Sequence, residues 1–207
     1  MSVEKETEEK IFEAARLIFQ ERGFEGARMQ EIADKASINK SMLHYYYRNK
    51  DNLFFEVFKA GVKKILPQLL AILNKEVDLK SKIKEIVEFY YVTFDEHPQL
   101  PSFVIYEMNQ NAERFKDFVS SHGFSLPQAY IDQVNLAVQE KRIKNIAPHQ
   151  LLMNIISLCL MPIVARNMAQ MLFKLDDANY LEFLEERRDI TPEFILAGIN
   201  YQEAHEK

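Results

Sequence analysis

The chain has 207 residues, of which 47% are hydrophobic and 28% charged, so it carries too much apolar surface for a disordered protein. Its single cysteine, Cys159, excludes an intramolecular disulfide framework and a zinc site built from several cysteines. The net charge of −5 excludes a chain that is basic throughout, although it allows a local basic surface.

Helical periodicity begins close to the N-terminus. Apolar residues from Ile11 to Phe19 recur at spacings of three and four, which predicts a helix. Thr7 is the expected N-cap of this helix, and Gly23 is its expected C-terminal stop. Two short helices are predicted next, at 29–36 and 40–47.

Asparagine residues precede the next two predicted helices. Asn39 is a suitable N-cap for the helix 40–47, and Asn49 for a long helix that begins at Lys50. Pro67 lies within the apolar pattern of that long helix, so we expect a kink or a break there.

The rest of the chain is also helical in pattern, and no stretch alternates apolar and polar residues as a strand would. Further helices are expected at 79–96, 102–109, 111–121, 125–141, 148–172, 177–188 and 192–204. The fold class is therefore all-α. We expect a helix-turn-helix domain of three helices at 1–52, followed by a larger helical domain at 53–207.

The apolar run at 151–165 is 15 residues long and contains Asn154, Ser157 and Pro162. A helix that spans a membrane needs about 20 apolar residues, so a buried helix is the better interpretation. The charged first residues do not form a secretory signal. We therefore expect a cytoplasmic protein with no membrane partner.

The layout of the N-terminal segment is that of a helix-turn-helix unit that binds double-stranded DNA. Residues 28–50 contain five basic and two acidic side chains, a net charge of +3 within an acidic chain. The helix 40–47 would present hydroxyl, imidazole and ammonium groups that bind phosphates and base edges. The alternative is a plain bundle of three amphipathic helices.

The same segment resembles the signature of TetR-family transcriptional regulators. The similarity is carried by Ile32-Ala33, Ala36-Ser37-Ile38, Leu43-His44-Tyr45-Tyr46-Tyr47 and Lys50-Asp51-Asn52-Leu53. It covers about residues 8–58 and implies a homodimeric regulator that binds operator DNA and responds to a small-molecule effector. The DNA-binding residues that it implies are Arg28, Lys40, Ser41, Met42, His44, Tyr45 and Lys50.

Three positions depart from the family pattern. Ser37 stands where glycine is usual in the turn, which costs energy if its φ is positive. Arg28 replaces the usual Thr or Ser cap of the second helix. His44 replaces a tyrosine, so that a phosphate contact from it would depend on pH.

The resemblance also implies that the C-terminal domain binds a ligand and forms the dimer. Because the helix around 151–171 is apolar on most sides, it needs cover from all directions. Candidates for the dimer interface are Leu151, Ile155, Leu158, Pro162, Arg166, Tyr180, Leu181 and Leu184; burial of this helix within its own subunit is the alternative. Candidates for an apolar pocket with a few polar groups are Tyr90, Tyr91, Phe94, Phe103, Tyr106, Asn109, Met153, Asn154, Met161 and Arg166.

The sequence contains no recognisable motif of an enzyme active site. Five glycines form no phosphate loop, and no metal-binding motif is present. We therefore expect no catalytic residues, metal or cofactor. The predicted function is a sequence-specific transcriptional regulator, a repressor released from its operator by an apolar or amphipathic effector. The alternative is a helical small-molecule-binding or scaffold protein that has lost DNA binding.

Overall fold

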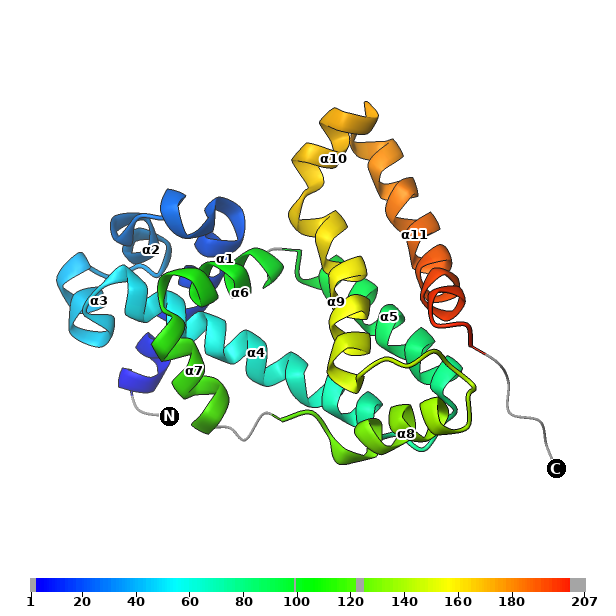
Figure 1. The fold of residues 1–207 in the computed structure, drawn as a ribbon. Coiled ribbons are helices and arrows are strands. Elements are labelled where there is room, and N and C mark those ends of the chain that lie inside the picture. Colours follow the sequence, from blue (N-terminus) through cyan, green and yellow to red (C-terminus); the bar gives the residue numbers. More distant parts are fainter. Residues whose placement is uncertain (1–2, 99, 122–124, 202–207) are drawn as a thin grey trace. The chain divides into compact units, whose positions relative to one another are not determined.

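The computed structural model describes residues 3–98, 100–121 and 125–201 of the chain, and Figure 1 shows them as helices joined by short connections. The helices are α1 (Val3–Gly26), α2 (Met29–Lys35), α3 (Lys40–Tyr47), α4 (Lys50–Asn74), α5 (Leu79–Glu96), α6 (Leu100–Gln110), α7 (Ala112–Ser121), α8 (Gln128–Gln139), α9 (Pro148–Val164), α10 (Arg166–Phe173) and α11 (Asp177–Gly198). These residues contain no strand, which confirms the all-α class.

Several helix boundaries differ from the expected ones. The first helix already begins at Val3, so Thr7 lies within it and does not cap it. Gly23 ends its straight part, because a φ of 66° turns the chain before a last turn of helix. The expected helix 148–172 is interrupted at Ala165, whose φ of −94° and ψ of 22° separate α9 from α10.

Pro67, Pro162 and Pro192 each lie inside a helix, and none of them ends it at that residue. The helix α4 continues through Pro67, and α11 continues through Pro192, where a new helix was expected to begin. A proline inside a helix removes one hydrogen bond and costs about 3 kcal/mol. Pro192 and the adjacent Thr191 are buried in α11, so packing offsets that cost and the helix remains intact.

The chain divides into two compact units. We call residues Met1–Lys64 and Gln99–Phe118 the head unit, and residues Ile65–Pro98 and Val119–Lys207 the body unit. The sequence predicts one boundary, after residue 52. Instead the head unit takes more of α4 and also α6 and most of α7, while the end of α4 belongs to the body unit.

Aromatic packing explains why α6 belongs to the head unit. Phe54 in α4 lies at the centre, with its ring centroid 5.0 Å from those of Phe19 and Phe24 in α1. From α6, Phe103 lies 4.8 Å from Phe54, and Tyr106 lies 4.4 Å from Phe24. Such ring pairs add stabilisation beyond the area that they bury.

The core of the body unit is aliphatic and joins the last turns of α4 to α5, α8, α9 and α11. Its fully buried members include Ile83, Val134 and Leu151. Lys82 is also buried, and its Nζ donates to the carbonyl of Leu73 at 2.9 Å, which ties α5 to the end of α4. Burial lowers the pKa of this lysine.

Length and apolar composition also bear on membrane insertion. No single helix in the described ranges is long and apolar enough to cross a membrane. The helices α9 and α10 would meet that criterion only as a pair, and they are bent by 73° relative to each other.

Candidate nucleic-acid interface

The turn between α2 and α3 is built from local hydrogen bonds. The Asn39 side chain accepts a hydrogen bond from the Met42 amide at 2.7 Å, which confirms Asn39 as the N-cap of α3. Ser37 has a φ of 57°, the left-handed conformation in which serine is less favourable than glycine. Ile32 of α2 and Leu43 of α3 are both fully buried, and the two helices pack against each other.

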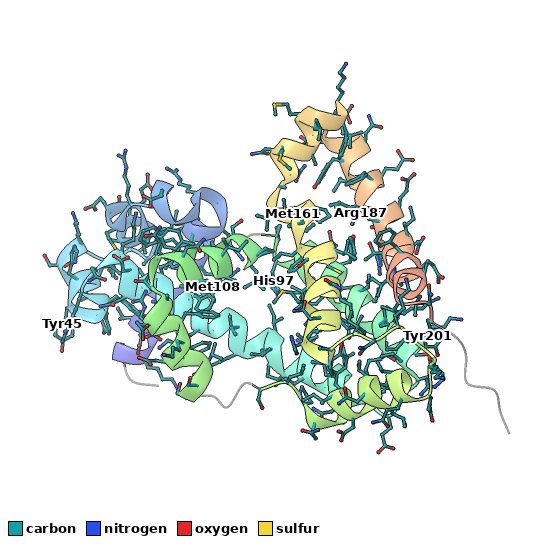
Figure 2. All side chains as sticks on the ribbon, in the orientation of Figure 1. Tyr45, His97, Met108, Met161, Arg187 and Tyr201 are labelled. Atoms are coloured by element: carbon teal, nitrogen blue, oxygen red, sulfur yellow. The ribbon has the colours of Figure 1, made fainter. Side chains whose placement is uncertain are left out.

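With Leu43 and Tyr47 facing the core, α3 leaves its other side to solvent. The exposed residues are Lys40, Ser41, Met42, His44 and Tyr45. Tyr45 is 78% exposed and points away from the rest of its unit (Figure 2). The face thus combines a cation, a hydroxyl, an imidazole and a phenol, groups that suit phosphates and base edges.

The imidazole of His44 has a fixed orientation. Its Nδ1 lies 2.7 Å from the carbonyl oxygen of Arg48, and because a carbonyl only accepts, Nδ1 carries the hydrogen. In the neutral ring Nε2 is then an acceptor, so it can donate to a phosphate only when the ring is protonated.

Arg28 occupies the N-cap position of α2 and makes no capping hydrogen bond through its side chain. Its exposed guanidinium can therefore reach a phosphate. The start of α2 is held by an ion pair instead, in which Arg22 of α1 donates to Glu31 at 2.8 Å.

Lys50 takes up a position that the sequence did not indicate. Its Nζ donates to the carbonyls of Phe24 at 2.8 Å and Ala27 at 3.2 Å, and it lies 4.2 Å from the centre of the Phe24 ring. These carbonyls follow the bend at Gly23, where the end of a helix leaves acceptors unsatisfied. The ammonium at the start of α4 therefore binds the end of α1, whereas the expected contact was with phosphate.

The pocket candidates do not form one group. Phe103 and Tyr106 belong to the aromatic core of the head unit, and Asn109 is exposed on the same helix. The other seven lie in the body unit: Tyr91 and Phe94 are buried in α5, and Tyr90 is half-buried beside them. Met153, Asn154 and Met161 are exposed on α9, whereas Arg166 begins α10 in an ion pair with Asp177.

A groove in the body unit contains one of these candidates, Met153. It has a volume of about 310 Å³ and is lined by Leu66, Leu69, Leu70, Leu73, Ser125, Leu126, Pro127, His149, Leu152, Met153 and Ile156. We call it the α4–α9 groove, after the two helices that supply most of its wall. The sequence did not indicate this site, although it contains the run of leucines at the end of α4 that lines the groove.

The candidates for the dimer interface need a correction. Leu151, Ile155 and Tyr180 are completely buried within the subunit, so they cannot contact a partner. Leu158, Pro162 and Leu184 are half-buried, and only Leu181 and Arg166 are exposed. One side of the apolar helix α9 thus faces the core of its own subunit, because α5 and α11 pack against it.

The sequence matches two family models. Residues 11–57 match the model described as bacterial regulatory proteins of the tetR family, and residues 80–195 match a tetracyclin repressor-like C-terminal domain. The chain belongs to the TetR family. It is therefore a DNA-binding transcriptional regulator, and of the two functions considered from the sequence these matches support the first.

Individual TetR-family relatives agree with this assignment. The Probable HTH-type transcriptional regulator YttP of Bacillus subtilis is 25% identical over 162 residues, 75% of this chain and 76% of that protein. The HTH-type transcriptional repressor SCO4008 of Streptomyces coelicolor is 32% identical over 101 residues, 49% of each chain. The structure of SCO4942 from the same species has a TM-score of 0.66 at 16% identity, covers 95% of this chain and 99% of that one, and shows a shared fold.

Proposed function

We propose that this TetR-family protein is a repressor that binds a two-fold symmetric operator as a homodimer and is released by a small apolar or amphipathic effector. The observation that carries the proposal is the exposed polar face of α3, held in place by Asn39 and surrounded by net positive charge. Similarity to SCO4008, which is named as a repressor, favours repression over activation.

Exposed apolar side chains support a dimer. Met161, Met168, Met171, Leu172, Phe173 and Leu181 are each more than half exposed on α9, α10 and α11. A patch of this kind is typical of a surface that is covered by a protein partner. A second copy of the chain is the partner that gives two recognition helices related by two-fold symmetry.

The α4–α9 groove is the proposed effector site. Its volume falls at the lower end of the range for ligand pockets, and its wall is mostly aliphatic with His149 and Ser125 as polar groups. Leu66, Leu69 and Leu73 at the end of α4 line it, and the same helix begins with Lys50, which holds the end of α1. An effector that moves α4 would therefore change the position of the recognition helix.

Selection of bound sequences from a random DNA pool tests the operator. We expect two inverted half-sites whose centres are about 34–36 Å apart, one turn of DNA, or a multiple of that distance. Selection of single half-sites, or of no sequence, would contradict the proposal.

A screen of amphipathic acids and alcohols by thermal shift, followed by operator titration, tests the effector. Met153→Glu places a charge in the groove and should abolish the response, whereas Leu136→Glu changes an exposed apolar residue of α8 outside it. Because coupling is reciprocal, operator DNA should weaken effector binding by the same factor as the effector weakens operator binding.

A further inference from the structure

The wall of the α4–α9 groove is made of aliphatic side chains. Among the described residues, no phenylalanine or tyrosine lines it. Its apolar members are Leu66, Leu69, Leu70, Leu73, Leu126, Pro127, Leu152, Met153 and Ile156. A planar ring system gains affinity from stacking against aromatic side chains, which this wall does not offer. A flexible hydrocarbon chain, in contrast, gains its affinity from apolar surface of any shape.

The two helices give the groove a definite length. Leu66 and Leu73 lie seven residues apart on α4, and His149 and Ile156 lie seven residues apart on α9. At about 1.5 Å per residue, each helix contributes a wall about 10 Å long. An extended hydrocarbon chain, with bonds of about 1.5 Å, advances about 1.3 Å per carbon. A chain of about eight to ten carbons therefore matches the wall.

Two polar side chains interrupt the apolar wall. His149 lies in the first turn of α9, and Ser125 precedes α8. Both side chains are exposed, and within the described residues neither forms a hydrogen bond or an ion pair. An imidazole and a hydroxyl can each donate a hydrogen bond, so both donors are available to a ligand.

The charge of the ligand follows from the same end of α9. Its N-cap, Ala147, has no side chain that could accept from the first amides of the helix. The start of a helix favours negative charge, because these amides lack partners and the helix dipole is positive there. His149 adds a donor at this place, so an anionic group fits better than a cation.

We propose that the effector of the α4–α9 groove is an unbranched aliphatic carboxylic acid of about eight to ten carbons. Its chain lies between the leucines of α4 and the side chains of α9, and its carboxylate accepts hydrogen bonds from His149 and Ser125. This inference rests on the proposed function, which assigns the effector to this groove, and it adds the chemical class of the ligand.

Binding to the full chain without DNA tests the class. Isothermal titration calorimetry compares the sodium salts of hexanoic, octanoic, decanoic and dodecanoic acid. Full burial of one methylene group tightens binding by about fourfold. We expect affinity to rise by two- to fourfold per carbon up to decanoate, and then to level off because a longer chain extends beyond the wall. An affinity that does not depend on chain length, or that still rises at the same rate from decanoate to dodecanoate, would overturn the proposal.

Two compounds with the same number of carbons as decanoate test shape and charge separately. Phenylbutanoate keeps the carboxylate but ends in a ring, and decanol keeps the chain without the charge. Each should bind about tenfold more weakly than decanoate. Phenylbutanoate that binds as tightly as decanoate would overturn the unbranched chain, and decanol that binds as tightly would overturn the carboxylate.

Variants assign binding to the groove. Met153→Glu places a negative charge in the wall and should abolish decanoate binding, whereas Leu136→Glu, outside the groove, should bind as the unmodified protein does. His149→Ala changes an exposed side chain and should weaken decanoate binding about tenfold, with decanol binding unchanged. Equal losses for the acid and the alcohol would overturn the position of the carboxylate.

The outcome is distinguishable from that of the proposed function, because binding is measured without operator. If decanoate binds in the groove but leaves operator affinity unchanged, the class of ligand stands and the proposed release fails. If another compound binds in the groove and releases the operator while the acids do not bind, the proposed release stands and the class of ligand is overturned.

Discussion

The head and body units are both helical and both have dense cores, but they differ in what they leave on their surfaces. In the head unit, α3 presents polar and charged side chains above a core of packed rings. In the body unit, the end of α9, α10 and α11 expose methionine, leucine and phenylalanine. The first kind of surface suits a nucleic acid and the second suits another protein chain.

The largest expected effect is a loss of stability when a residue on the buried side of α9 is truncated. Ile155 is fully buried, so Ile155→Ala should lower the free energy of unfolding by about 2–5 kcal/mol through the cavity that it leaves. Urea unfolding of the body unit measures this. Leu136→Ala is the exposed control and should change the value by less than about 0.5 kcal/mol.

A charge introduced on the exposed apolar side of the body unit should change the oligomeric state of the protein. Leu181 is 56% exposed in the subunit, so Leu181→Glu should give a monomer that keeps its helical circular dichroism. Sedimentation measures the mass, and Leu136→Glu should remain a dimer. A folded monomer for the unmodified protein would contradict the proposed homodimer.

Within the head unit, a substitution of Lys50 distinguishes a structural role of this residue from a contact with phosphate. Lys50→Met should destabilise the head unit by about 2 kcal/mol, because it removes charge-assisted hydrogen bonds to two carbonyls. Operator affinity should then fall for all sequences, with an unchanged dependence on salt.

Lys40 provides the comparison. It is exposed on α3, so Lys40→Ala should reduce the slope of log affinity against log salt by about 1.8, which is about 0.9 for each subunit of the proposed dimer. A similar reduction for Lys50→Met would contradict the structural role and restore the phosphate contact that the family resemblance implies.

Smaller effects are expected in the turn before α3. Asn39→Ala should destabilise the head unit by about 1 kcal/mol, because the Met42 amide loses its acceptor. Ser37→Gly should stabilise it by about 0.5–1 kcal/mol, since glycine adopts a φ of 57° without strain. In denaturant unfolding, the free energy of unfolding should therefore fall for Asn39→Ala and rise for Ser37→Gly. Destabilisation by Ser37→Gly would contradict this expectation.

The smallest expected effect comes from His44, whose Nδ1 donates to the Arg48 carbonyl and holds the ring on the exposed face of α3. His44→Ala removes one polar side chain from that face, so operator affinity should fall only a few-fold. Binding assays at constant salt and pH measure this change, and an unchanged affinity would show that His44 does not contact DNA.

The sequence determined the elements and the recognition surface because these depend on local features. Spacing of apolar residues located the helices, and Asn39 and Asn49 capped α3 and α4 as expected. The exposed face of α3 followed from the same periodicity, since the positions of Leu43 and Tyr47 fix which residues point outward.

Only the tertiary structure decided which long-range partners each side chain meets. Packing of Phe103 and Tyr106 assigned α6 to the head unit, and core burial carried α11 through Pro192. The bend at Gly23 gave Lys50 its acceptors, and the approach of α5 to α11 brought Tyr91 to Arg187 and Thr191. These outcomes join residues far apart in the chain, and periodicity and capping act only over a few residues.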